Sequence, residues 1–178
     1  MMVPAGAGAR FEPPSIHLSG STLEYVTKFR YLGHIIANNL RDDDDIMREI
    51  RSLNARGNTI IRKFGILSLD VKCELFKSYC YPLYTCALWA DYNQGTLNRL
   101  KVAYNNIMRR LAYVPPWSSA SHMFGSLGVR SFQETMRNYS YSLMRRIDHC
   151  PNEFINVISD SDASMLSKQR NQWISILF

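Results

Sequence analysis

Four consecutive aspartates, Asp42 to Asp45, are the part of this sequence that most resembles a metal site. Enzymes that polymerise or cleave nucleic acid use clustered carboxylates to hold two divalent cations. Successive residues of a helix, however, point about 100° apart around its axis, so four in a row do not converge on one ion. The aspartates also begin a long predicted helix, where Asp42 is a good N-cap and the helix dipole favours anions. We therefore expect helix capping here and no metal site.

Other arrangements that carry out catalysis are missing from the sequence. There is no glycine-rich phosphate loop, and no recognisable triad motif surrounds any of the histidines, which are His17, His34, His122 and His149. The cysteines lack C-x-x-C spacing, and they are Cys73, Cys80, Cys86 and Cys150. Cys73 and Cys80 fall in an apolar helical pattern that is typical of buried free thiols in a reducing compartment. We expect no catalytic residue, metal or cofactor in this chain.

Basic side chains offer a different chemistry, the binding of phosphate. Lys and Arg number 21 against 15 Asp and Glu, giving a net charge of +6. Residues 101–150 hold seven basic and two acidic residues, so this stretch carries most of that charge. The doublets Arg109-Arg110 and Arg145-Arg146 stand late in predicted helices, where they suit the helix dipole, but the arginine fork also fits phosphate. The charge is compatible with a nucleic-acid partner and also with a basic domain that binds none.

Aromatic residues accompany the first of these doublets. Tyr104, Tyr113 and Trp117 lie close to it in the sequence and could stack on nucleobases. Aromatic side chains at this spacing more often belong to a core, which is the interpretation that the periodicity favours.

The segments before residue 38 indicate a small β element. Residues 1–14 are rich in Gly, Ala and Pro and are predicted to be disordered. Two short extended runs within 15–26, separated by Ser19 to Thr22, predict a β-hairpin. Phe29 to Ile36 is rich in aromatic and β-branched residues and predicts a third strand, in which Gly33 marks a bulge or a close backbone approach. The β element is therefore expected over residues 15–37.

Residues 38–150 are predicted to form a helical bundle. The first helix runs from the aspartates to Phe64, and Gly57 within it weakens the helix but allows close packing. A second begins after Ser68 and ends near Tyr81 because of Pro82. The remaining helices run from Gln94 to the Pro115-Pro116 stop, through a short turn at Met123 and Phe124, and from the Ser131 capping box to Ile147. A loosely ordered tail is expected over 151–178. The fold class is α+β, mostly α.

Several short motifs, in order, resemble a known family. Phe29 to Ile36 resembles the F-x-Y-L-G-h-x-I segment of non-LTR (LINE-type) retrotransposon reverse transcriptases, which in that family forms the primer grip. Later segments resemble the start and continuation of the thumb, and they are Leu75 to Tyr84, Leu100 to Asn106 and Leu127 to Val129. The resemblance covers about residues 13 to 150.

The family's catalytic aspartates have no counterpart here. They come from a Y-A-D-D box and an earlier palm strand, both of which would precede residue 13, and Asp42 to Asp45 follow the primer grip. The resemblance implies that Tyr31, Leu32 and Gly33 approach the primer end, where glycine allows close backbone contact. It also implies that the helices clamp an RNA–DNA or other nucleic acid duplex by its phosphates. The candidates for phosphate contact are Arg48, Arg51, Arg62, Lys63, Lys101, Arg109, Arg110, Arg145 and Arg146.

The expected function is therefore a nucleic-acid-binding, C-terminal fragment of a reverse transcriptase, not catalytic alone, with Mg2+ only in the complete parent enzyme. The alternative is a helical protein-interaction module, and retained polymerisation is a third hypothesis that we do not favour. Apolar surface around Tyr25, Phe29 and Ile35, left uncovered by the missing palm, could cause self-association. No signal peptide or membrane span is seen in the sequence, so we expect a location in the nucleus or cytoplasm.

Overall fold

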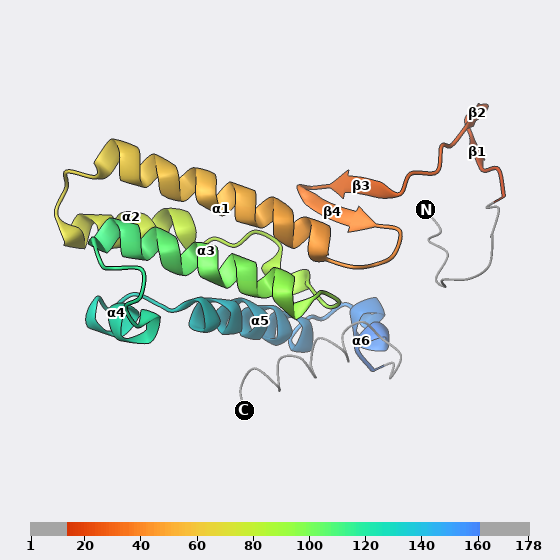
Figure 1. Ribbon diagram of the computed structural model, residues 1–178. Helices are drawn as coiled ribbons and strands as arrows, with labels where there is room; N and C mark the ends of the chain where they lie inside the picture. Colours follow the sequence, from red (N-terminus) through yellow and green to blue (C-terminus); the bar gives the residue numbers. More distant parts are fainter. Residues whose placement is uncertain (1–13, 161–178) are drawn as a thin grey trace.

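The computed structural model describes residues 14–160, which are mostly helical with two small antiparallel strand pairs, so the predicted α+β, mostly helical class is confirmed (Figure 1). The elements are β1 (His17–Leu18), β2 (Ser21–Thr22), β3 (Lys28–Tyr31), β4 (His34–Ala37), α1 (Asp43–Phe64), α2 (Leu69–Cys80), the 3-10 turn η1 (Cys86–Leu88), α3 (Gln94–Ala112), α4 (Ala120–Ser126), α5 (Phe132–Asp148) and α6 (Glu153–Asp160). The disorder predicted for residues 1–14 falls, apart from residue 14, outside the described residues, and so do residues 161–178 of the predicted loose tail.

The segment from Lys28 to Ala37 is a hairpin, so the prediction of one strand through Gly33 is wrong. β3 pairs with β4 in antiparallel register, with Tyr31 opposite His34 at the turn. The two turn residues, Leu32 and Gly33, have φ of 46° and 87°, and positive φ at both positions of a two-residue loop reverses the chain. Alternating aromatic and β-branched residues suit two hairpin arms as well as one strand, which is why the pattern alone did not separate them.

The long helices α1 and α3 lie side by side and run in the same direction, with α2 running back between their ends (Figure 1). Gly57 on α1 makes this approach possible, because a Cβ built there would stand 2.6 Å from Ile107 Cδ1 on α3. The close packing that Gly57 predicts is confirmed. Contacts farther along join Asp43 to Asn93 and Asn58 to Arg110, so residues of the two helices about 50 positions apart lie at matching heights.

The core lies between these helices and continues toward α4 and α5. Fully buried side chains include Leu53 and Ile60 of α1 and Leu100 and Met108 of α3. An aromatic cluster joins four elements through ring contacts between Phe76, Tyr104, Phe124 and Phe132. Tyr104 is therefore a core residue, and its hydroxyl donates to the Arg130 carbonyl at 2.9 Å.

The helix boundaries follow local signals that are visible in the sequence. α2 ends at Cys80, two residues before Pro82, as predicted. α5 begins at the predicted capping box, in which Ser131 and Glu134 bond each other's backbone N–H groups. The helix α6 lies where the sequence predicted a loose tail; the Asn152 side chain accepts a bond from the Phe154 N–H at its start, which is a capping signal.

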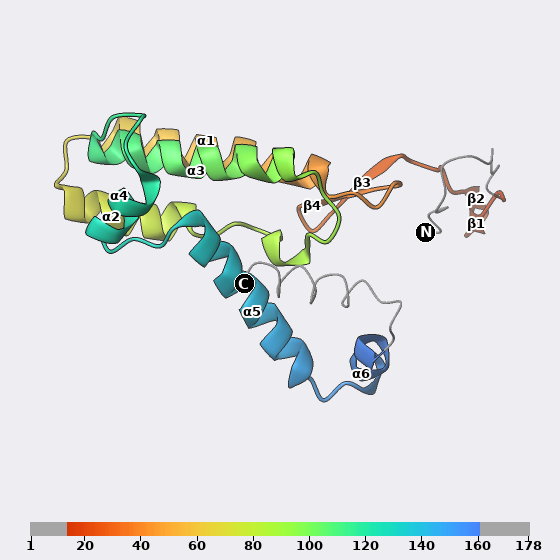
Figure 2. The ribbon, with the colours of Figure 1, turned by 60° about the horizontal axis from the view of Figure 1, so that its bottom comes forward.

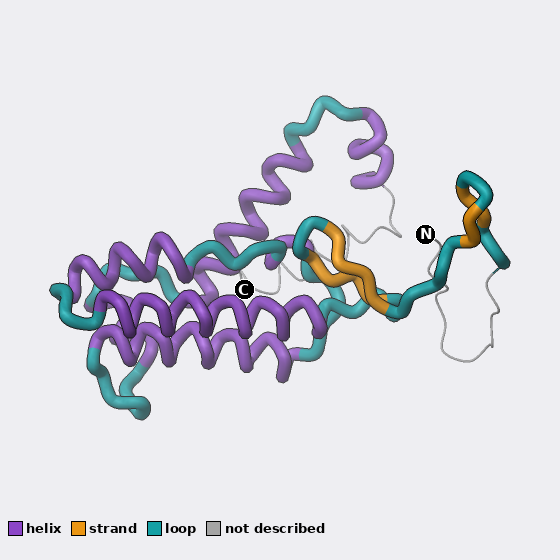
Figure 3. The backbone as a smooth tube through the Cα atoms, turned by 90° about the horizontal axis from the view of Figure 1, so that it is seen from above, coloured by secondary structure: helices purple, strands orange, loops and turns teal. Residues whose placement is uncertain are grey.

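The hairpins and the last two helices lie outside the three-helix stack. Figure 2 shows α5 leaving the bundle at an angle, with α6 at its far end. Figure 3 shows the β3–β4 hairpin next to the end of the bundle where α1 begins, and the β1–β2 hairpin standing beyond it. None of the helices in residues 14–160 has the length and apolar character needed to cross a membrane.

Candidate nucleic-acid interface

Asp45 is the centre of an internal network that ties the β3–β4 hairpin to the helices. Its side chain is fully buried, and its oxygens accept hydrogen bonds from Ile35 N of β4 (3.0 Å), Thr85 Oγ1 (2.7 Å) and Trp89 Nε1 (2.8 Å). Arg48 Nε donates a further bond at 2.7 Å. Burial alone would raise the pKa of Asp45, but these hydrogen bonds outweigh it and lower the pKa to about 2. A carboxylate with this many donors is a structural anchor.

The other three aspartates bind three different neighbours. Asp42 is buried and accepts bonds from the backbone N–H groups of Ala90 (2.8 Å) and Asp91 (3.0 Å), and burial raises its pKa. Asp43 accepts a bond from Asn93 N at the start of α3, and Asp44 pairs with Lys28 of β3 at 2.9 Å.

These contacts correct the capping prediction. Asp42 stands at the N-cap position of α1 but its side chain makes no capping bond. Asp42 and Asp45, three residues apart, share one face of α1, and the imidazole of His34 lies between them, 3.1 Å from Asp45 and 3.9 Å from Asp42. Within residues 14–160, no three His, Cys, Asp or Glu side chains gather as the ligands of a metal would.

Arg48, predicted to contact phosphate, belongs to this network instead. Its guanidinium pairs with Asp45 and with Glu49 (3.0 Å), and its side chain is 16% exposed. Glu49 is fully buried, and Arg56 pairs with its other oxygen while donating to the Pro82 carbonyl at 2.6 Å. We call the set Asp42, Asp45, Arg48, Glu49 and Arg56 the buried charge network. A buried carboxylate requires such partners, so Arg48 is already bound within the protein.

The loop Tyr31-Leu32-Gly33, predicted to resemble a primer grip, is the exposed tip of the β3–β4 hairpin. Tyr31 and Leu32 are 57% and 73% exposed. The hydroxyl of Tyr84, which follows α2, donates to the Leu32 carbonyl at 2.7 Å, and its ring would lie 3.1 Å from a Cβ built on Gly33. The close approach that the glycine predicts is therefore made by the chain's own Tyr84, which fixes the loop on the bundle.

Four exposed arginines line the outer surfaces of α1 and α3. Arg51 and Arg62 lie eleven residues apart on α1, and Arg99 and Arg110 lie eleven apart on α3. Eleven residues bring a helix back to within about 20° of the same direction and advance it about 16 Å. Each arginine of α1 has its counterpart 48 positions later on α3. This spacing is close to the offset of about 50 positions between residues of the two parallel helices that contact each other. We call this set, with Asn58, the arginine face; Arg110 Nη1 donates to Asn58 Oδ1 at 3.0 Å and joins its two rows.

The arginine face contains no acidic residue to neutralise it. Residues 51–68 hold four basic residues and no Asp or Glu, and residues 92–133 hold five basic residues and no Asp or Glu. All four acidic residues of α1 lie in its first seven positions, and the buried charge network uses two of them, Asp45 and Glu49. Arg99 is not among the residues predicted to contact phosphate; its eleven-residue spacing from Arg110, which repeats that of Arg51 and Arg62, is the signal that could have indicated it.

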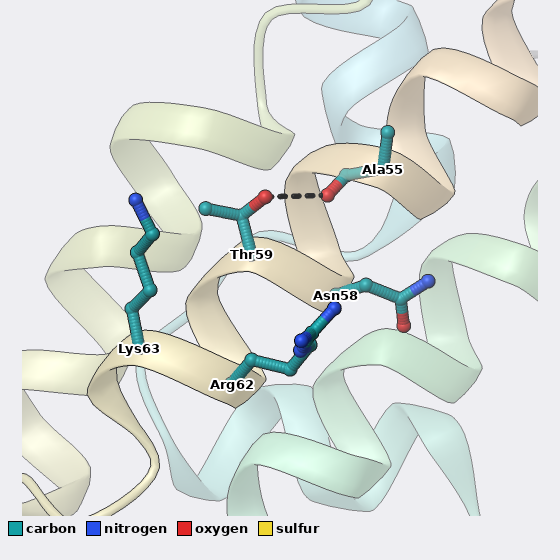
Figure 4. Close-up of a pocket in the computed structure, with 5 residues that line it drawn as sticks. All are labelled: Ala55, Asn58, Thr59, Arg62 and Lys63. Atoms are coloured by element: carbon teal, nitrogen blue, oxygen red, sulfur yellow. Dashed lines mark hydrogen bonds between the residues drawn. The ribbon is translucent and has the colours of Figure 1, made fainter.

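A shallow groove of about 450 Å³ lies on α1 within this surface (Figure 4). Its lining residues are Ala55, Asn58, Thr59, Arg62 and Lys63. Thr59 Oγ1 donates to the Ala55 carbonyl at 2.9 Å, and Lys63 points to the opposite side of α1 from Asn58. The groove therefore presents amide, hydroxyl and cationic groups on the outer surface of α1.

The remaining predicted residues are spread over other surfaces. Lys101 is half-buried on α3. Arg109 donates to Asn106 Oδ1 and to the Ser118 carbonyl, both at 3.0 Å, and so holds the loop after α3. Arg145 and Arg146 are exposed near the end of α5, away from α1 and α3 (Figure 2). Of the nine predicted contacts, the structure brings together Arg51, Arg62 and Arg110, with Lys63 at their edge.

The exposed apolar residues also differ from one another in their surroundings. Tyr25 and Phe29, expected to promote self-association, are 40% and 47% exposed, whereas Ile35 is partly covered. Tyr113 and Trp117, after α3, are 77% and 86% exposed, so the core interpretation holds for Tyr104 but not for these two.

Comparison with known proteins gives one weak relationship. The chain is similar to an RNA-directed DNA polymerase from the mobile element jockey of Drosophila funebris, with 22% identity over 167 residues. The match covers 89% of this chain and 18% of that protein, so the chain spans about a fifth of its relative's length. No protein-family model matches the chain, and no solved structure does. The similarity supports a relationship to the reverse transcriptases of non-LTR retrotransposons.

Proposed function

We propose that this chain is the thumb-like C-terminal portion of a non-LTR reverse transcriptase, and that it holds a template–primer duplex against the arginine face of α1 and α3. The carboxylates that bind Mg2+ and carry out nucleotide transfer would come from other parts of the parent enzyme. The chain alone would bind nucleic acid without extending it.

The observation that carries this proposal is the arginine face itself, which lies on two parallel helices and contains no Asp or Glu. Arginine forms forked hydrogen bonds with phosphate oxygens, and the absence of nearby carboxylates leaves its charge available. The two arginines of each row are about 16 Å apart, which corresponds to roughly five phosphate steps at about 3.4 Å per step along one strand. Contacts of this type position a duplex by its backbone and do not read its sequence.

The β3–β4 hairpin would act at the end of the same surface. Its loop lies at the end where α1 begins, and it is fixed there by two separate contacts, Tyr84 with Leu32 and Asp45 with Ile35. A hairpin held this way keeps its position relative to the arginine face. The proposed primer contact of Tyr31, Leu32 and Gly33 and the proposed duplex contact of the helices are therefore parts of one rigid surface.

Fluorescence anisotropy with a labelled RNA–DNA hybrid over a series of salt concentrations tests the proposal. Each phosphate contact adds about −0.9 to the slope of log affinity against log salt for B-DNA, so four arginines predict a slope of roughly −3 to −4. The double variant Arg62→Gln with Arg110→Gln removes two charges from the face, and Arg145→Gln with Arg146→Gln removes two from α5. We expect the first to reduce both affinity and slope markedly more than the second; equal effects, or no binding by the folded protein at low salt, would contradict the proposal.

A helical protein-interaction module remains the second candidate because of α6. Phe154 and Val157, three residues apart on that helix, are 72% and 70% exposed, and such a pair can anchor an apolar contact with a protein. Binding through this surface would change little with salt concentration. Removal of Phe154 by substitution with Ser would abolish it while leaving the hybrid affinity unchanged.

A further inference from the structure

The end of the bundle opposite the β3–β4 hairpin carries an unusual group of side chains. The loop after α1 and the loop after α3 meet there, because the Tyr113 hydroxyl donates to the Gly65 carbonyl at 3.1 Å (Figure 1). We call this region the bundle tip and define it by Ile66, Lys72, Tyr113 and Trp117. Ile66 is 98% exposed, and both aromatic rings are exposed for more than three quarters of their surface. Trp and Tyr exposed together on a rigid loop are typical of binding surfaces.

Tyr113 is held in a conformation that its residue type disfavours. It follows α3 with φ of 55° and ψ of 35°, the left-handed position at which helices usually place glycine. Its N–H and that of Val114 both bond the Arg109 carbonyl, so the helix end requires this backbone shape. A tyrosine kept where glycine is favoured suggests that the ring itself has a use.

Lys72 is the second independent feature of the tip. It is 5% exposed, and its ammonium lies 4.5 Å from the centre of the Tyr113 ring. Within residues 14–160 no carboxylate lies at ion-pair distance from this ammonium, and it donates no hydrogen bond to a described residue. The stem of Lys72 is buried, whereas its ammonium nitrogen keeps some access to solvent, so a ligand can reach it. A phosphate group would supply a negative charge that neither the ring nor a carboxylate provides there.

We propose that the bundle tip binds an unpaired nucleotide of single-stranded nucleic acid. The base stacks on the open face of Tyr113 and on Trp117, and a neighbouring phosphate approaches Lys72, with Lys63 at the end of α1 nearby in sequence. Base stacking on aromatic side chains together with cationic contacts to the backbone is the usual way in which proteins bind single strands.

The proposal rests on the proposed function in one respect, the route of the strand. α1 and α3 both end at the tip, so a duplex lying along the arginine face would direct a single-stranded extension toward Tyr113 and Trp117. The tip's ability to bind a free single strand does not depend on that route, so the two proposals can fail separately.

Anisotropy with three labelled ligands tests the inference on the full chain. The ligands are a blunt RNA–DNA hybrid, the same hybrid with a four-nucleotide overhang, and the overhang hybrid made abasic in its single-stranded part. We expect the overhang to improve affinity by roughly tenfold and the abasic overhang to lose most of that gain. Trp117→Ala and, separately, Tyr113→Gly should remove the gain without changing affinity for the blunt hybrid; glycine suits the left-handed position, and Trp117 packs too little to affect folding. Trp117→Phe should retain the gain in affinity from the overhang, because phenylalanine can also stack. Tyr79→Ala, which removes an exposed tyrosine of α2, should leave this gain unchanged.

The outcomes separate the two proposals. Equal affinity for blunt and overhang hybrids, or an overhang gain that survives both tip variants, overturns the inference while leaving the arginine face untouched. Binding of free single strand with no binding of the blunt hybrid supports the tip and contradicts the proposed function. A shift of Trp117 fluorescence with anionic lipid vesicles but not with single-stranded nucleic acid also overturns the inference, because the surface would then favour a membrane.

Discussion

Two groups of arginines on α1 differ in their surroundings: one is buried and paired with carboxylates, and the other is exposed. Arg48 and Arg56 turn inward and neutralise Asp45 and Glu49, whereas Arg51 and Arg62 turn outward on the same helix. The positions differ by only three residues between Arg48 and Arg51, which rotates the side chain by about 60° around the axis. Residue type and local charge density are therefore poor guides to which arginine is available for a ligand.

The face of the helix explains the difference. Every acid of α1 lies between Asp43 and Glu49, and the two that are buried, Asp45 and Glu49, pair with Arg48 and Arg56. Arg51 lies between those two arginines in the sequence but is exposed; α1 has no acid beyond Glu49, and α3 has none. The inward face of α1 thus fixes the hairpin and the connection after α2 to the bundle, and its outward face leaves cationic side chains exposed beside those of α3.

The substitution Asp45→Asn should have the largest effect on stability. It leaves Arg48 with Glu49 as its one remaining carboxylate partner and weakens the bonds from Thr85 and Trp89, so we expect the free energy of unfolding to fall by about 3 kcal/mol. Asp44→Asn is the matched control, because the Asp44–Lys28 pair is exposed and should change stability by less than about 1 kcal/mol. Urea denaturation measures both. Equal effects would show that the network is not the anchor of the hairpin.

Acid should weaken the buried network before it affects the arginine face. The pKa of Asp45 is lowered to about 2 in the fold, so its contribution is complete above its unfolded pKa near 3.8 and is lost as the pH falls through about 2. The lowered pKa of Asp45 corresponds to a contribution of roughly 2 kcal/mol to the free energy of unfolding. Burial raises the pKa values of Asp42 and Glu49. Their effect on the pH dependence of stability is therefore opposite to that of Asp45, because their protonation at falling pH favours the folded state. Urea midpoints from pH 6 to pH 2 should drop below pH 4 in the native protein and much less in Asp45→Asn.

Gly57 determines how closely the two rows of arginines approach. Gly57→Ala would place a methyl group against Ile107, so it should destabilise the protein by about 1–2 kcal/mol even though alanine favours helices. Gly125→Ala is the control, because nothing lies within 4 Å of a Cβ there and no positive φ is required. The affinity of Gly57→Ala for the RNA–DNA hybrid should also fall, since α3 must move away from α1. Unchanged affinity would show that the spacing of the rows is unimportant.

Much of the fold could be predicted from local signals, and the sites could not. Ser131 and Glu134 as a capping box and Pro82 after α2 act through neighbours in the sequence. Gly57 was recognised as a packing position from its residue type alone, although its partner Ile107 lies on another helix. The role of Asp45 depends on Thr85 and Trp89, which lie 40 and 44 residues away, and no local pattern reveals such contacts. The hairpin at Leu32-Gly33 was not predicted because its two arms show the same alternation of aromatic and β-branched residues as a single strand. Arg48 was predicted to lie on the surface because its inward direction depends on which part of α1 the hairpin covers.

Paired substitutions at Arg48 and Arg51 compare the two regions most directly, and Arg51→Gln has the smallest expected effect on stability. Arg51→Gln should leave the free energy of unfolding within about 0.5 kcal/mol of the native value, since its side chain is exposed. It should weaken binding of the RNA–DNA hybrid about threefold to tenfold and reduce the salt slope by about 1, as expected for one phosphate contact. Arg48→Gln should do the reverse, destabilising the protein while leaving the salt slope of the folded fraction unchanged. A reduced salt slope for Arg48→Gln would show that its guanidinium leaves the network to reach a phosphate, and the division between an internal and an external set of arginines would then have to be abandoned.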